Sequence, residues 1–135
     1  QEIEVYSVLA MSPEMMRYLN GRGIATATFI GYDTDEEAIE LAKANDHQIV
    51  FLSNKNGRTQ PREGLVTWAE RVAYIRAAGV KAPVFGVTGI STAEELREVK
   101  EAGADGAYIG TIMMKLWEHE SELWKKLDEF QEAAE

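Results

Sequence analysis

Two short glycine-containing segments carry the residues best suited to bind an anion. Gly89 with Ser91, and Gly110 with Thr111, each follow an apolar run typical of a buried strand and precede a helix start. The first N–H groups of a helix have no partner within the helix and attract phosphate, and glycine lets the backbone approach the anion closely. These segments therefore predict a phosphate pocket built mainly from main-chain N–H groups.

A repeat in the sequence predicts how these two segments are positioned. Ala-Gly-Val and a strand-like run ending at Gly86 are echoed by Ala-Gly-Ala and a run ending at Gly110, and Gly79 and Gly103 match at the same interval. An interval of about two dozen residues holds one strand and one helix, which favours βα units around a parallel sheet. Ligands of such folds bind at the carboxyl ends of the strands, where Gly89 and Gly110 are expected.

Apolar runs and helix signals predict about five βα units in a single domain of residues 1–135. A helix over 65–77 and a C-terminal amphipathic segment over 115–135, as one long or two shorter helices, are also expected. The fold class is thus α/β, with parallel βα units of the TIM-barrel type. Five strands cannot close an eight-stranded barrel, so either an open flavodoxin-like sheet or an associated half barrel is expected. The expected strands are residues 4–9, 25–30, 48–52, 83–87 and 106–109.

Several acidic residues are weak candidates for a general acid or base. Asp33 and Asp35 follow the second expected strand, at the end where a catalytic base would lie. Asp33 and Thr34 each have capping-box spacing to the glutamate three residues later, and caps explain these residues without catalysis. Glu63, in the loop after the third expected strand, is the remaining candidate. The residues alone therefore leave the catalytic groups undetermined.

The connection over residues 53–64 is unusually long for a βα fold. Such connections usually have about two to six residues, so a loop that closes over a ligand is expected. Gly57 and Gly64 are suited to act as hinges, and Arg58 and Arg62 to contact an anion. The same arginines also fit the role of solvated loop residues.

Composition excludes several classes of function. The chain has 135 residues and a net charge of −9, which argues against nucleic acid as a partner. It has no cysteine, so disulfides and thiolate metal sites are excluded, and neither a metal nor a cofactor is predicted. No apolar run approaches the roughly 20 residues of a membrane span, and a cytoplasmic location is expected. Because the first residue is Gln1, we expect either a trimmed chain or a piece of a longer one.

From Gly23 to its end, the chain resembles the C-terminal portion of the tryptophan synthase alpha subunit family. The segments IVFLSNKNGRT and VFGVTGISTAEELREVKEAGADGAYIGTIMMK carry this resemblance. It implies a TIM barrel and a lyase of tryptophan biosynthesis that cleaves indole-3-glycerol phosphate to indole and glyceraldehyde 3-phosphate. It also implies phosphate contacts from Gly57, Thr59, Gly89, Ser91, Gly110 and Thr111.

The departures from the family pattern affect loop closure, indole binding and catalysis. Gln60 replaces a loop glycine, and Val50 stands where an aromatic residue is expected near the substrate. The family's two catalytic carboxylates lie on early strands, whereas this chain begins around the fourth of eight. Three hypotheses follow: a lyase portion active only with the missing half, a stand-alone or engineered half barrel that folds or self-associates without catalysis, and a small enzyme using Asp33, Asp35 or Glu63. The implied partners are a small phosphorylated substrate, a second copy or a complementary barrel fragment, and a tryptophan synthase beta subunit.

Overall fold

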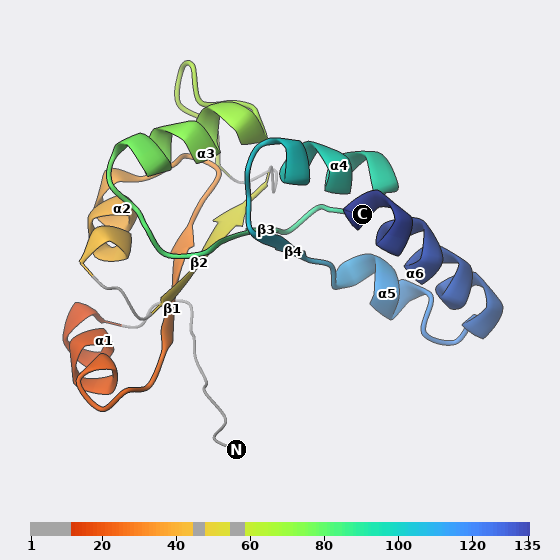
Figure 1. Ribbon diagram of the computed structural model, residues 1–135, viewed down its shortest axis with the longest axis horizontal. Coiled ribbons are helices and arrows are strands. Elements are labelled where there is room, and N and C mark those ends of the chain that lie inside the picture. Colours follow the sequence, from red (N-terminus) through yellow and green to blue (C-terminus); the bar gives the residue numbers. More distant parts are fainter. Residues whose placement is uncertain (1–11, 45–47, 55–58) are drawn as a thin grey trace.

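Four parallel strands alternate with helices in the described part of the chain (Figure 1). The computed structural model describes residues 12–44, 48–54 and 59–135. The strands are β1 (Thr26–Ile30), β2 (Gln48–Ser53), β3 (Val84–Val87) and β4 (Gly106–Tyr108). The helices are α1 (Pro13–Asn20), α2 (Glu36–Lys43), α3 (Trp68–Ala77), α4 (Ala93–Glu101), α5 (Thr111–Lys115) and α6 (Glu120–Ala134).

The sheet order is β1-β2-β3-β4, so each strand pairs with its neighbour along the chain. This sequential parallel order is that of a segment of a (βα) barrel, and it confirms the predicted α/β class. Four of the five expected strands form at the expected places. The expected strand over residues 4–9 lies outside the described residues.

One face of the sheet is buried under helices. Ile30, Leu52 and Val84 point to this face and are fully buried. They pack in one apolar cluster with residues of α2, α3, α4 and α6, including Ile39 and Ile75. Burying each such side chain contributes about 1.5–3 kcal/mol, so this layer supplies most of the stability of the domain. Figure 1 shows α2, α3 and α4 on the same side of the sheet.

The opposite face of the sheet carries large apolar side chains that no described residue covers fully. Phe29, Phe51 and Phe85 lie in one register across β1, β2 and β3. Phe29 and Ile49 are exposed, and Tyr108 is 66% exposed. In a complete barrel this face would fill the interior. Among the described residues, the arrangement therefore matches a partial barrel and not a flavodoxin-like sheet, whose two faces both carry helices.

Two of the repeated glycines allow close packing around β3 and β4. A Cβ added at Gly86 would lie 2.7 Å from Cγ1 of Val99, so glycine lets α4 approach β3. A Cβ added at Gly106 would lie 2.5 Å from Cε1 of Phe85, whose ring lies against β4. Contacts this short do not occur in folded proteins without rearrangement, so larger residues would displace α4 or the phenyl ring.

Side chains cap the four helices α1, α2, α3 and α4. Ser12 caps α1, and full capping boxes begin α3 at Thr67 and α4 at Thr92. At α2 the cap is Asp35, whose side chain accepts a hydrogen bond from the Ala38 N–H. The expected capping boxes beginning at Asp33 and Thr34 are therefore wrong. The C-terminal segment contains the short helix α5 and, after a turn, the 15-residue helix α6.

Candidate functional site

The predicted site residues lie at the carboxyl ends of the four strands, because parallel strands all end at the same edge of the sheet. β3 and β4 are paired neighbours, with Val87 opposite Tyr108. Gly89 and Ser91 follow β3, and Gly110 and Thr111 follow β4, so the register brings these two segments to adjacent strand ends. Thr59 is half-buried in the loop after β2. Gly57 and Arg58 lie outside the described residues.

A buried arginine, Arg71 of α3, joins the ends of β1 and β2. It is only 1% exposed. Its Nη2 donates to the carbonyl of Gly31 at 2.6 Å, and its Nη1 donates to the carbonyl of Ser53 at 2.6 Å. Its Nε donates to Oγ1 of Thr34 at 2.9 Å. One guanidinium therefore satisfies acceptors from two neighbouring strand ends and fixes their separation.

The charge of Arg71 is held in an unusual environment, because none of its three hydrogen-bond acceptors is a carboxylate. Burial lowers the pKa of Arg71 to about 10, while Tyr32 and Asp33 act in the opposite direction. The rings of Tyr32 and Trp68 lie 5.2 and 5.8 Å from the guanidinium carbon. The cation is thus stabilised by main-chain dipoles, ring faces and one nearby negative charge.

Two threonines at strand ends have backbone conformations that side chains disfavour. Thr34, after β1, has φ of 51°, and Thr88, after β3, has φ of 64°. Such conformations cost about 1–3 kcal/mol each and occur often at ligand-binding sites. Thr34 is fully buried and is held by Arg71, while Thr88 is exposed beside Gly89. The strain at Thr88 therefore lies in the predicted phosphate segment itself.

The predicted anion contact Arg62 is engaged by residues of α2 and α3. Its Nη1 lies 2.6 Å from Oε1 of Glu36 and donates to the carbonyl of Thr34 at 3.1 Å. Tyr74 donates a short hydrogen bond to the same carboxylate. The hydrogen bonds from Tyr74 and then Arg62 lower the pKa of Glu36. This cluster fastens the loop after β2 to the outer helices.

The carboxylate of Glu95 lies at the start of α4. One carboxylate oxygen of Glu95 accepts from the N–H groups of Ser91 at 2.6 Å and Thr92 at 3.0 Å. These are amides that a bound phosphate would use at a helix N-terminus. The hydroxyl of Ser91 lies 3.5 Å from the carbonyl of Gly89. A phosphate at this turn would therefore compete with Glu95 or use the amides that precede Ser91.

The segment after β4 is more open. Gly110 is the N-terminal cap residue of α5, and no side chain caps that helix. A Cβ added at Gly110 would meet only Cε1 of Tyr108, at 3.5 Å. Small side chains at this position therefore fit without a clash. An aspartate at this position would add a negative charge at the start of α5, just after β4.

The weak catalytic candidates have different surroundings. Asp35 serves as the cap of α2, as described above. The carboxylate of Asp33 lies over Gly31, since a Cβ there would meet its Oδ1 at 2.6 Å. Glu63 is exposed in the loop. A catalytic role for any of the three stays a prediction.

Within the described ranges, no group of three or more His, Asp or Glu side chains is arranged to hold a metal, and no helix is long and apolar enough to cross a membrane.

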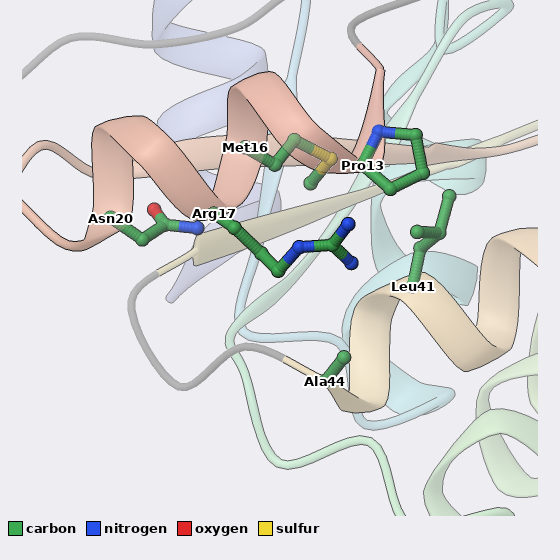
Figure 2. A pocket seen from close by; sticks show the side chains of 6 residues that line it. All are labelled: Pro13, Met16, Arg17, Asn20, Leu41 and Ala44. Carbon is green, nitrogen blue, oxygen red and sulfur yellow. The ribbon is translucent and has the colours of Figure 1, made fainter.

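Among the described residues, two hollows lie beside the helices, and neither is lined by the predicted phosphate residues. The smaller has a volume of about 200 Å³ and lies between α1 and α2, where Arg17 extends toward Leu41 and Ala44 (Figure 2). The larger, of about 550 Å³, lies between α4, β4 and α6.

No protein-family model matches this sequence, and no curated protein matches it either. Solved structures do match the fold. The tryptophan synthase alpha subunit of Campylobacter jejuni is 22% identical with a TM-score of 0.69, over 92% of this chain and 52% of that one. The alpha subunit from Legionella pneumophila is 18% identical with a TM-score of 0.64, over 95% and 50%. A chain of the BexX/CysO complex of Amycolatopsis orientalis is 22% identical with a TM-score of 0.61, over 90% and 46%.

At these identities the likeness concerns the fold, and the chain spans about half the length of the structures that it matches. The alpha subunits agree with the resemblance carried by the sequence segments around Gly89 and Gly110. The third structure shows that the same half-length arrangement also matches a protein of another name, so the fold does not select an activity. The chain therefore has the fold of about half of a TIM barrel, as found in tryptophan synthase alpha subunits.

Proposed function

We propose that this chain recognises the phosphate group of a small phosphorylated substrate at the ends of β3 and β4. The observation that carries this proposal is the pairing of those strands, because Val87 opposite Tyr108 makes the segments of Gly89 and Gly110 neighbours. Main-chain N–H groups and the hydroxyls of Ser91 and Thr111 supply donors of the kind that bind phosphate. The net charge of −9 makes a small anion held by local donors a better ligand than a polyanion.

Within that function, we propose that the chain is the phosphate-binding portion of a lyase that cleaves indole-3-glycerol phosphate. The resemblance in sequence and the shared fold of the alpha subunits support this assignment. Cleavage of the carbon–carbon bond needs one group that donates a proton and one that accepts it. The resemblance assigns both to strands that precede this portion, so turnover requires carboxylates supplied by a complementary barrel portion.

The proposal is tested by calorimetric titration of the purified chain with inorganic phosphate, glycerol phosphate and indole-3-glycerol phosphate. We expect saturable binding that Gly110→Asp weakens at least tenfold, because the new carboxylate lies beside the anion. The matched control is Ala73→Asp, which adds the same charge on the exposed side of α3. Absence of binding by the folded parent chain, or equal binding by both variants, contradicts the proposal.

The alternative is a half barrel that folds, associates and binds phosphate without catalysis. The apolar face of the sheet that no described residue fully covers favours it, since association would bury that face. Equal affinity for glycerol phosphate and indole-3-glycerol phosphate supports this alternative, whereas a clear preference for the indole compound supports the lyase. Turnover by the chain alone that Asp33→Asn abolishes would instead identify a small enzyme using Asp33.

A further inference from the structure

An apolar groove runs along α6 on the β4 side of the sheet. We call it the α6 groove, with a volume of about 550 Å³ and with Leu96, Ile109, Trp124, Leu127 and Asp128 among its lining residues. Trp124 is 57% exposed, and Leu127 is also exposed. Apolar side chains of this size rarely gather uncovered on a monomer surface unless they bind something. One carboxylate, that of Asp128, also lines the groove.

The opposite edge of the sheet carries a surface of matching chemistry. Helix α1 buries Met16 but exposes Tyr18, which is 57% exposed. The guanidinium carbon of Arg22 lies 4.1 Å from the centre of the Tyr18 ring. Tyr18 and Arg22 together, here called the α1 knob, present an apolar ring beside a positive charge. The α6 groove offers an apolar lining beside a negative charge.

The charges of the surrounding helices are complementary as well. Helix α6 contains five carboxylates and two lysines, and one of those lysines, Lys126, is paired with Glu129. Residues 12–22, which contain α1, have two arginines and one glutamate. Arg17 and Arg22 therefore make the α1 side locally basic in an otherwise acidic chain. Such complementarity favours contact between the two sides and disfavours contact of α6 with itself.

We propose that the partner in the α6 groove is the α1 knob of a second copy of this chain. In Figure 1, α1 and β1 lie at one end of the sheet, while β4 and α6 lie at the other. A two-fold rotation about an axis along the strands brings the knob of each copy to the groove of the other. Both grooves are then filled, and the association closes as a dimer. The faces of the two sheets that carry Phe29 and Phe51 then point toward each other.

This inference concerns association and does not depend on phosphate binding or turnover. Its first test is the molar mass of the chain by light scattering across a range of concentrations. We expect twice the mass of one chain for the parent and the mass of one chain for Tyr18→Glu and for Trp124→Glu. Trp117→Glu is the matched control, because Trp117 is more exposed than Trp124 and does not line the groove. The three substituted positions are exposed, and circular dichroism checks that the parent and each variant are folded.

The second test mixes the Tyr18→Glu and Trp124→Glu variants. A Tyr18→Glu copy keeps an intact groove and a Trp124→Glu copy keeps an intact knob, so one of the two contacts re-forms when the variants are mixed. We expect the mixture to contain dimers that neither variant forms alone. In the same way, Arg22→Glu and Asp128→Arg should each raise the dissociation constant at least tenfold, and the double variant should recover most of the loss.

Three outcomes would overturn the proposal. A parent chain that stays monomeric at high concentration shows that the groove is not filled by a second copy. Dimers that persist in both Tyr18→Glu and Trp124→Glu place the interface elsewhere. Failure of the mixed variants to associate shows that knob and groove do not meet. If Tyr18→Glu or Trp124→Glu fails to fold, Arg22→Glu, Asp128→Arg and their double variant test the contact instead.

Discussion

At the scale of single residues, Arg71 shows how one side chain can align two strand ends. Its planar guanidinium reaches the carbonyls of Gly31 and Ser53 and the hydroxyl of Thr34 at once. A lysine has the same charge but cannot match three acceptors in that fixed geometry. The Gly31 carbonyl also accepts from the Thr34 N–H at 3.0 Å. Losing the guanidinium therefore removes three hydrogen bonds from a charged donor at a buried site.

We therefore predict that Arg71→Lys lowers the free energy of unfolding by about 3 kcal/mol or more, since lysine cannot replace the buried charged hydrogen bonds that the guanidinium makes. Urea denaturation followed by circular dichroism measures the change. Arg97→Lys, at an exposed position on α4, is the control and should change stability by less than about 0.5 kcal/mol. Equal stability of the two variants would show that Arg71 does not hold the strand ends together.

Arg71 was not predicted from the sequence, and the reason is physical. The helix over 65–77 was recognised from its apolar positions, and an arginine on that helix is ordinarily solvated. Arg71 lies one position before the buried Val72 and three after the buried Trp68, so helical spacing alone places it near the core face. Its acceptors, however, are two main-chain carbonyls and the Thr34 hydroxyl, all far away in sequence, which no local pattern identifies.

At the scale of elements, the capping box that begins α3 gives a measurable pH dependence. Hydrogen bonds to Glu70 from the Thr67 N–H, the Val66 N–H and the Thr67 hydroxyl lower the pKa of Glu70 below its ordinary value of 4.5. Because the folded pKa is the lower one, this carboxylate stabilises the fold above pH 4.5, and the contribution is lost as pH falls through the folded pKa.

We predict that Glu70→Gln lowers the thermal midpoint by a few degrees near pH 6 and by clearly less near pH 3. Thermal melts of parent and variant at both pH values measure the difference. Glu101→Gln serves as the control, because Glu101 is the last residue of α4 and takes no part in a capping box. A midpoint difference for Glu70→Gln that is the same at both pH values would contradict the assignment.

The start of α4 offers a test that separates capping from ligand binding. Glu95 occupies the amides of Ser91 and Thr92, so its negative charge opposes a phosphate at the same turn. We predict that Glu95→Gln raises the affinity for inorganic phosphate roughly threefold or more, because the repulsion is removed while the side chain can still accept a hydrogen bond. Glu98→Gln, one turn further along α4, should leave the affinity unchanged. Equal affinity in both variants would place the phosphate away from this turn.

Strands and most caps were predictable because their signals are local. Apolar runs gave β1 to β4, and Thr67 and Thr92 stand three residues before the glutamates that complete their boxes. The cap of α2 was misplaced because Asp33, Thr34 and Asp35 are all capping residue types. Tertiary contacts decide which of them caps the helix. The Thr34 hydroxyl accepts from Arg71, and the Thr34 carbonyl accepts from Arg62. The spacing of Thr92 and Glu95 also indicates a capping box in the predicted phosphate segment, but only the structure shows that Glu95 accepts from the Ser91 N–H as well.

At the scale of the whole molecule, the central question is what covers the second face of the sheet. Sequence alone could not distinguish a flavodoxin-like sheet from a half barrel, because strands buried on both faces read alike in either fold. The structure places the described helices against one face and leaves Phe29, Ile49 and Tyr108 exposed on the other. Association that buries this face must stabilise the folded chain, because only the folded copies can form it.

That coupling gives a prediction for the intact protein. If folded copies pair through the α1 knob and the α6 groove, unfolding separates them, so the thermal midpoint rises with concentration. For two chains of this length, we expect an increase of about 5 °C over a hundredfold range of concentration. Tyr18→Glu should remove the dependence without changing the midpoint of the most dilute sample by more than a few degrees. A dependence that survives in this variant would locate the stabilising contact on another surface. A midpoint of the parent that does not change with concentration would contradict the association of folded copies.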